Sequence, residues 1–122
     1  MAGIFKAYDV RGLYPDPLNE DVARRIERAF KAVFDPQRVA ANPTVVVSRD
    51  MRSHSVPLSE ALIDGLLESG LDVVDIGLAT TPTNYFAVGS LGTSGGLQVT
   101  ASHNPARYNG IKFSRHEAWP VS

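Results

Sequence analysis

Short apolar runs alternate with longer segments of helical periodicity along most of this chain, and this alternation limits the folds open to it. Residues 44–48 (TVVVS) are dominated by β-branched side chains, which is typical of a strand covered on both faces. Residues 56–69 repeat leucine at helical steps and predict an amphipathic helix. Its apolar stripe is predicted to consist of Leu58, Leu62, Leu66 and Leu67.

The same two patterns recur on either side of this pair. Asn19 has the side chain of an N-cap and precedes a predicted helix that runs to about Phe34. Gly70 stands where a left-handed C-cap is expected, and Thr81 with Pro82 resembles an N-cap and first helical position. The remaining predicted elements are strands at 71–76, 96–100 and 110–114, a helix at 81–91, and loops at 12–17 and 35–43.

Strands that alternate with helices of ten or more residues favour right-handed crossovers and a sheet with parallel strands. The predicted fold class is α/β: a layered α/β/α domain with a mainly parallel, mixed sheet. The 122 residues suffice for one domain with a modest core, so residues 1–122 are read as a single domain. Ligands of such sheets bind beyond the carboxyl ends of the strands. Two predicted loops, 49–55 and 101–109, occupy that position.

Composition excludes several classes of protein. The net charge of −1 gives no general attraction for nucleic acid or anionic lipid, so neither is an expected partner. The chain has no cysteine, which rules out disulfides and thiolate metal sites. No apolar stretch is long enough to span a bilayer, and residues 1–12 lack the apolar region of a signal peptide. We therefore expect a soluble, cytoplasmic protein.

The second of the two loops carries the most suggestive chemistry. Ser102 follows a predicted strand and is flanked by turn-forming pairs, Asn-Pro and then Asn-Gly. Backbone N–H groups in such a loop are not committed to a sheet and can surround an anion. Lys112 alternates with Ile111 and Phe113, so it faces the opposite side of the strand if those two face the core.

Two other readings of Ser102 remain open from the residues alone. A serine after a strand most often caps a turn or a helix. His103 beside it suggests a hydrolase base, but adjacent side chains rarely point together and the chain has no G-x-S-x-G elbow. An acyl-transfer triad is therefore disfavoured.

Four ordered motifs resemble those of the α-D-phosphohexomutase family. The string TASHNPARYNGIKF at 100–113 resembles the phosphoserine loop of that family. Residues 5–12 (FKAYDVRG) are similar to its N-terminal A-Y-D-x-R-G motif, 49–52 (RDMR) to its R-D-x-R turn, and 81–83 (TPT) to its T-P turn. The chain departs from the pattern at Ser48, often glycine in the family, and at residues 53–55.

The resemblance implies a reaction. In the family the serine carries a phosphate, donates it to a sugar monophosphate and takes the other phosphate back from the bisphosphate intermediate. Carried over, Ser102 is the phosphate carrier, and through that phosphate a ligand of Mg²⁺. The other metal ligands are aspartates of a D-G-D-G-D-R loop in a second domain, a string absent from this chain. Glucose or mannose 1,6-bisphosphate is the implied activator, and a hexose phosphate is the implied substrate.

The resemblance also implies roles for further residues. Arg11, Lys112 and His103 join Ser102 as catalytic residues. We favour electrostatic clamping for Arg11, since arginine is a poor base, whereas lysine can act as an acid or a base. Substrate or phosphate binding is implied for Tyr8, Asn104, Arg49 and Arg52. The alternative, non-functional interpretations are that Lys112 is an exposed lysine on a strand and that Arg49 and Arg52 form a salt-bridge network around Asp50.

The chain ends soon after the strand that bears Lys112, so this domain is expected to be incomplete at its C-terminal end and to expose apolar surface that favours self-association. Full members of the family have four domains with the active cleft between them, so this domain is also expected to be inactive alone. The alternative from another class is a non-catalytic module that binds a phosphorylated ligand. Within the family, Tyr108 favours a mannose or glucose phosphomutase over a phosphoglucosamine mutase, which commonly has aspartate there.

Overall fold

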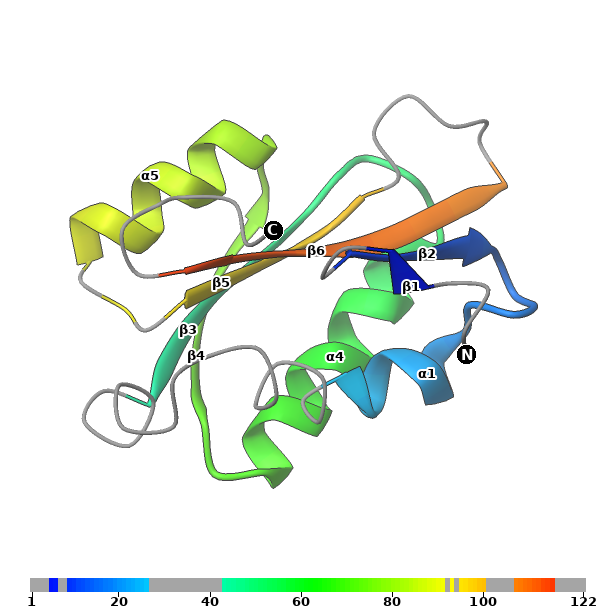
Figure 1. The fold of residues 1–122 in the computed structure, drawn as a ribbon, viewed down its shortest axis with the longest axis horizontal. Coiled ribbons are helices and arrows are strands. Elements are labelled where there is room, and N and C mark those ends of the chain that lie inside the picture. Colours follow the sequence, from blue (N-terminus) through cyan, green and yellow to red (C-terminus); the bar gives the residue numbers. More distant parts are fainter. Residues whose placement is uncertain are drawn as a thin grey trace.

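Figure 1 shows the fold of the 122-residue chain as a computed structural model. The structure describes residues 5–6, 9–26, 43–91, 93, 95–100 and 107–115. The C-terminal part of the first predicted helix, beyond Ile26, lies outside these ranges.

The described residues contain six strands and three helices. The strands are β1 (Phe5–Lys6), β2 (Asp9–Leu13), β3 (Thr44–Arg49), β4 (Asp72–Leu78), β5 (Gly95–Val99) and β6 (Tyr108–Arg115). The helices are α1 (Glu20–Arg24), α4 (Ser55–Glu68) and α5 (Thr81–Leu91). None of these helices is long and apolar enough to cross a membrane.

All six strands form one mixed sheet in the order β1-β2-β6-β5-β3-β4. The pairs of β3 with β4 and with β5 are parallel, whereas β5–β6, β6–β2 and β2–β1 are antiparallel. Helices α1 and α4 cover one face and α5 the other (Figure 1). The layered α/β/α architecture with a mixed sheet is thus confirmed. The sheet is not mainly parallel, however, because three of its five strand pairings are antiparallel, and strand–helix alternation did not predict these.

The core lies between the sheet and the pair α1–α4. Leu58, Leu62 and Leu66 of α4 are fully buried against strand residues, as their spacing predicts. The prediction for Leu67 is wrong, because that side chain is 51% exposed. It lies about 100° around the helix from Leu66, outside the stripe that the other three leucines define.

Two of the predicted helix caps are confirmed. The Asn19 side chain accepts a hydrogen bond from the Val22 amide at 3.1 Å, which satisfies one free N–H at the start of α1. Gly70 adopts a φ of +92° after α4. Its amide donates to the Leu67 carbonyl and the Leu71 amide to the Leu66 carbonyl, the pairing of a Schellman motif.

The cap of α5 differs from the prediction by one residue. Thr81 is already the first residue of the helix, and the cap is Thr80. The Thr80 hydroxyl accepts a hydrogen bond from the Thr83 amide at 3.2 Å. Both positions are threonine, so composition alone did not distinguish them.

Two predicted loops are partly strands. Gly12 and Leu13, assigned to a loop, are the last residues of β2, which had not been predicted at all. Tyr108 and Asn109, assigned to the end of the serine loop, open β6. Charged residues, glycine and asparagine have low intrinsic strand preference, and here cross-strand pairing outweighs that preference.

Candidate functional site

The carboxyl ends of β3 and β5 lie side by side at one edge of the sheet, as predicted from the parallel order. Arg49 and Val99, the last residues of the two strands, are paired in register. The Asp50 amide then donates to the Val99 carbonyl at 3.0 Å, which brings the start of one turn directly against the end of the other strand. The residue after Val99 is Thr100, two positions before Ser102.

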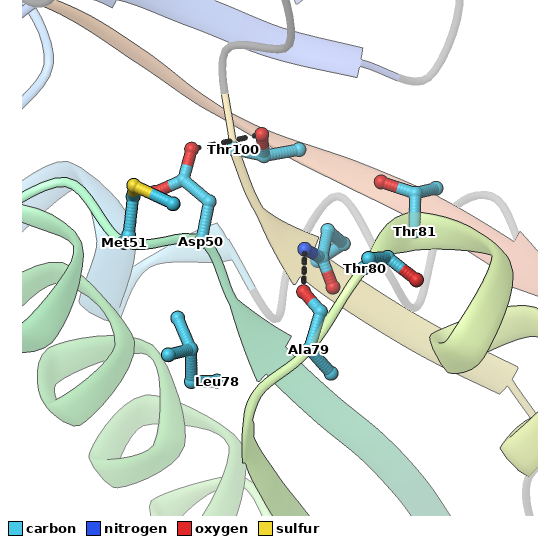
Figure 2. Close-up of a pocket in the computed structure, with 8 residues that line it drawn as sticks. Asp50, Met51, Leu78, Ala79, Thr80, Thr81 and Thr100 are labelled. Atoms are coloured by element: carbon cyan, nitrogen blue, oxygen red, sulfur yellow. Dashed lines mark hydrogen bonds between the residues drawn. The ribbon is translucent and has the colours of Figure 1, made fainter.

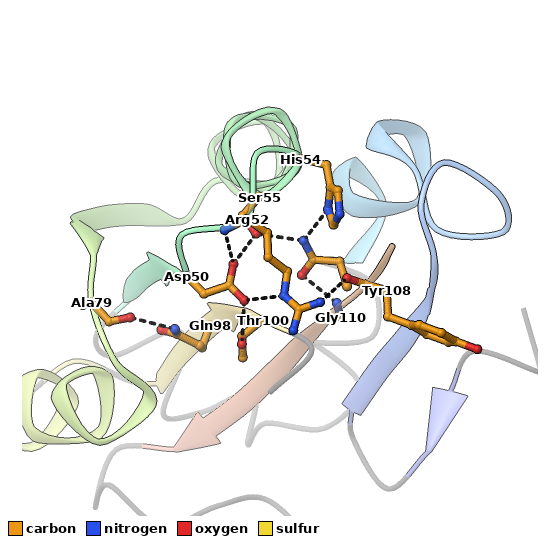
Figure 3. Close-up of polar contacts among 10 residues, drawn as sticks. Asp50, Arg52, His54, Ser55, Ala79, Gln98, Thr100, Tyr108 and Gly110 are labelled. Carbon is orange, nitrogen blue, oxygen red and sulfur yellow. Dashed lines mark hydrogen bonds and ion pairs between the residues drawn. The ribbon is translucent and has the colours of Figure 1, made fainter. Parts of the chain in front are cut away.

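Asp50 is the centre of a polar network at this edge (Figure 3). One carboxylate oxygen, Oδ1, accepts hydrogen bonds from the Ser55 hydroxyl at 2.5 Å and from the Arg52 amide at 3.1 Å. The other, Oδ2, accepts from the Thr100 hydroxyl at 2.9 Å and from Arg52 Nε at 3.1 Å. Asp50 therefore joins three segments: its own turn, the start of α4 and the end of β5.

The electrostatics of Asp50 favour its charged form. Partial burial raises the pKa of the carboxyl, but the hydrogen bonds from Ser55, the Arg52 amide and Thr100, together with the positive charge of Arg52, lower it by more. The net pKa lies below the ordinary value of 3.8. Asp50 is consequently ionised at neutral pH and acts as an acceptor.

Arg52 connects Asp50 to the next strand. Its side chain is 15% exposed, its Nε forms the ion pair with Asp50, and its Nη1 donates to the Tyr108 carbonyl at 2.9 Å. The structure therefore shows Arg52 in an ion pair with Asp50, as the salt-bridge interpretation of the R-D-x-R turn predicted. Its contact with a phosphate stays a prediction, as does that of Arg49, which is partly buried at the end of β3.

Asn109 and His54 extend the network, and sequence reasoning assigned neither of them a role. Asn109 is fully buried, and its Nδ2 lies 2.8 Å from both Ser55 Oγ and His54 Nδ1. Its Oδ1 accepts from the Gly110 amide at 2.8 Å. The His54 ring stacks on Tyr14, with centroids 4.7 Å apart and planes 13° from parallel. The signal that was available was Asn109 within the Asn-Gly pair, which had been read as a turn.

Lys112 lies on the opposite face of the sheet from Asn109. Ile111 and Phe113 are buried in the core on the α4 side, so the prediction that Lys112 faces away from it is confirmed. Lys112 is the register partner of Gln98, and Gln98 of Ser48, to which Asn84 of α5 donates at 2.8 Å. Register partners share a face, so Lys112 belongs to the α5 side of the sheet.

The other predicted site residues lie outside what the structure describes. Ser102, His103 and Asn104 belong to segment 101–106, and Tyr8 lies between β1 and β2. Arg11 is placed by its backbone only, in β2 and in register with Gly110 of β6. Their roles stay predictions.

A pocket of about 320 Å³ opens beside Asp50 at the ends of β3, β4 and β5 (Figure 2). Its eight described lining residues carry a single formal charge, that of Asp50, and include no lysine, arginine or histidine. Among the described residues, moreover, no three histidine, aspartate or glutamate side chains gather in a way that could hold a metal ion. The residues that line the pocket are Asp50, Met51, Leu78, Ala79, Thr80, Thr81, Gln98 and Thr100.

Comparison with known proteins places this geometry in a family. Residues 2–122 match the family model described as phosphoglucomutase/phosphomannomutase, alpha/beta/alpha domain I. A phosphomannomutase of Klebsiella pneumoniae is 48% identical over 118 residues, which cover 97% of this chain and 71% of that protein. One from Escherichia coli is also 48% identical over 118 residues, but these are only 25% of its length.

A solved structure has the same fold. The crystal structure of a phosphoglucomutase/phosphomannomutase family protein from Burkholderia thailandensis superposes with a TM-score of 0.84 and 42% identity. The match covers 98% of this chain and 28% of that one. This chain thus spans about a quarter of the length of most relatives it matches. Fold, motifs and coverage agree, and the chain belongs to the phosphoglucomutase/phosphomannomutase family, in which it corresponds to the alpha/beta/alpha domain I.

Proposed function

We propose that this chain is the phosphoserine-bearing domain of a Mg²⁺-dependent phosphohexomutase, with Ser102 as the phosphate carrier. The observation that carries the proposal is the anchoring of both flanks of segment 101–106 at the ligand-binding edge of the sheet. Thr100 bonds to Asp50 on one side, and the Arg107 carbonyl accepts from the Tyr14 amide at 2.8 Å on the other. Parallel sheets bind ligands at this edge.

The proposed step is a phosphoryl transfer from a hexose 1,6-bisphosphate to the Ser102 hydroxyl. A P–O bond to the sugar breaks, a P–O bond to Ser102 Oγ forms, and the hydroxyl proton ends on the released sugar oxygen. Such transfers depend on positioning and on cations more than on covalent help. We assign the neighbouring positive charge to Arg11 and Lys112, and a further catalytic role to His103. Phosphate or substrate contacts are assigned to Tyr8, Asn104, Arg49 and Arg52.

Magnesium enters the proposal through the phosphate alone. Asp50 is hydrogen-bonded to Thr100, two residues before Ser102 in the sequence, and its carboxylate already accepts four hydrogen bonds, so it does not fit the role of a metal ligand. A phosphoserine carries about −1.5 to −2 charges and would bind a hard cation well. The ion would offset that charge, and its other ligands would come from outside the described residues.

The substrate that we propose is a mannose or glucose phosphate, interconverted between its 1- and 6-phosphates. Relatives named phosphomannomutase and phosphohexose mutases support this class. Because the chain spans about a quarter of most of these relatives, we propose that the 122 residues alone do not sustain full turnover. A phosphoglucosamine mutase is the alternative within the family.

Intact-mass analysis tests the proposal on the chain as it exists. Incubation with glucose 1,6-bisphosphate and Mg²⁺ is expected to add one phosphate, located on Ser102 by peptide mapping, and the Ser102→Ala variant is expected to add none. Ser90→Ala, at an exposed position of α5, is the matched control and should behave as the parent chain does. Reversible binding of the sugar phosphate without any covalent product would favour a non-catalytic binding module instead.

A further inference from the structure

We propose that the turn after β3 is a latch, formed by Asp50, Arg52 and Ser55, that positions segment 101–106 for phosphoryl transfer. Asp50 is its positioning residue. The inference rests on the proposed function, because the latch matters for chemistry only if Ser102 carries phosphate.

The latch holds the upstream end of the segment through Thr100. The Thr100 hydroxyl donates to Asp50 Oδ2 at 2.9 Å, and the Thr100 amide donates to the Gly110 carbonyl at 2.8 Å. Thr100 is only 6% exposed, so its hydrogen bonds are shielded from water. Removing the acceptor would leave a buried hydroxyl without this partner, which is costly.

The same carboxylate reaches the downstream end by two routes. Arg52 bonds to Asp50 Oδ2 through Nε and to the Tyr108 carbonyl through Nη1 at 2.9 Å. Ser55 donates to Asp50 Oδ1 and accepts from Asn109 Nδ2 at 2.8 Å. Figure 3 shows Arg52, Ser55 and Thr100 bonded to Asp50, and Arg52 bonded in turn to Tyr108. One group therefore fixes both flanks of a six-residue segment.

The directions of the hydrogen bonds explain why the centre must be a carboxylate. Two donors point at each oxygen of Asp50. An asparagine could replace only one of these oxygens, and its NH₂ group would face two donors at the other position. A charged acceptor also strengthens each bond and holds the Arg52 fork in place. Asp50→Asn should therefore weaken the hold on both flanks without changing the size of the side chain, because loss of the charge also weakens the bonds that remain.

A latch and a turn that only stabilises the fold differ in their expected effect on the rate of phosphate uptake. A reacting group that is displaced by about 1 Å can lose on the order of 100-fold in rate. A latch variant should thus slow phosphate uptake on Ser102 far more than a variant of equal stability loss elsewhere. Arg52→Lys should be intermediate, because an ammonium group cannot reach both the Asp50 carboxylate and the Tyr108 carbonyl with fork geometry.

The experiment has two readouts on the 122-residue chain. Hydrogen exchange by NMR follows the amides of Thr100 and Tyr14, which donate to Gly110 and Arg107. Mass spectrometry follows the initial rate of phosphate uptake from glucose 1,6-bisphosphate. The variants are Asp50→Asn and Arg52→Lys. Ser59→Ala removes a hydroxyl that donates within α4, and Gly65→Ala supplies a global stability loss at a distant helix contact.

In Asp50→Asn we expect both amides to exchange faster and phosphate uptake to slow by about 10- to 100-fold. Ser59→Ala should show neither effect. Gly65→Ala should show no comparable slowing of phosphate uptake. Unchanged exchange, or unchanged uptake despite faster exchange, overturns the latch. If the parent chain takes up no phosphate at all, the proposed function fails. The exchange readout then still decides whether Asp50 holds the two flanks, and unchanged exchange overturns that as well.

Discussion

At the scale of single residues, the hydrogen bonds at the carboxyl end of β3 run from donor to acceptor toward the Asp50 carboxylate. Asn109 donates to Ser55, Ser55 donates to Asp50, and the Asp50 carboxylate accepts four hydrogen bonds. Each of these donors thus has an acceptor, which is the condition for burying polar groups at low cost. The arrangement rigidifies an edge where the proposed chemistry requires fixed positions.

Asp50 makes stability depend on pH at the acid end. Its folded-state pKa lies below 3.8, so the unfolded chain binds more protons in this range. Its contribution is complete above about 3.8 and is lost as the pH falls through the folded-state pKa. Urea unfolding of the parent chain and of Asp50→Asn should show a stability difference at pH 6 that shrinks toward pH 3. A constant difference across that range would contradict the assignment, and Asp64→Asn serves as an exposed control.

Asn109 is the residue whose truncation should cost most within the network. Asn109→Ala removes the acceptor of the Gly110 amide and the donors to Ser55 and His54, all in a fully buried position. We expect a loss of about 1–3 kcal/mol in unfolding free energy, measured by urea denaturation. Arg25→Ala, which removes an exposed ion pair with Asp21, should change it by less than about 1 kcal/mol. Equal losses for the two variants would show that the buried network adds nothing.

At the scale of elements, the packing of α1 on α4 depends on a missing side chain. A Cβ added at Gly65 would lie 1.9 Å from the Arg24 carbonyl oxygen, a clash with backbone that no rotamer change can relieve. Gly65→Ala gains about 1 kcal/mol in helix propensity but must separate the two helices. Overpacking typically costs about 1–3 kcal/mol, and a contact this short lies at the upper end.

Thermal unfolding followed by circular dichroism measures the outcome. We expect Gly65→Ala to lower the melting temperature, although alanine is the better helix former. Glu60→Ala, an exposed position of the same helix, is the matched control and should leave the melting temperature nearly unchanged. A melting temperature raised by Gly65→Ala would refute the close approach of the helices.

The elements differ in how far the sequence predicted them. Strand β3 and helices α4 and α5 were found because long apolar periods and caps such as Gly70 are local signals. Strand β2 was missed because its sequence, DVRGL, becomes a strand only through pairing with β1 and β6. For the same reason β6 starts at Tyr108, two residues earlier than predicted.

At the scale of the whole molecule, the position of the candidate site could be predicted from the sequence, but the side-chain contacts within it could not. Strand order in a parallel sheet places the turns after β3 and β5 at one edge, so their meeting follows from topology. The bond from Arg52 to Tyr108 joins residues 56 positions apart. The stacking of His54 on Tyr14 likewise joins distant segments. No local pattern encodes such contacts.

On the proposed function, this chain alone is not expected to sustain full turnover. The Escherichia coli phosphomannomutase that it matches is about four times longer, and the proposed magnesium ion takes its other ligands from outside the described residues. We expect the purified 122 residues to convert glucose 1-phosphate to glucose 6-phosphate at well below ~1 s⁻¹, the lower end of ordinary enzyme turnover. A coupled dehydrogenase assay measures this rate, and turnover in the usual enzymatic range would show that one domain suffices.

The most direct test of the account follows a single phosphate through the protein. Chain loaded with labelled phosphate from glucose 1,6-bisphosphate is freed of sugar and then mixed with unlabelled glucose 6-phosphate and Mg²⁺. A phosphate carrier at Ser102 predicts that label leaves the protein and appears in glucose 1,6-bisphosphate, and that Ser102→Ala never acquires it. Label that stays on the protein, or that is released only as inorganic phosphate, would contradict the central claim.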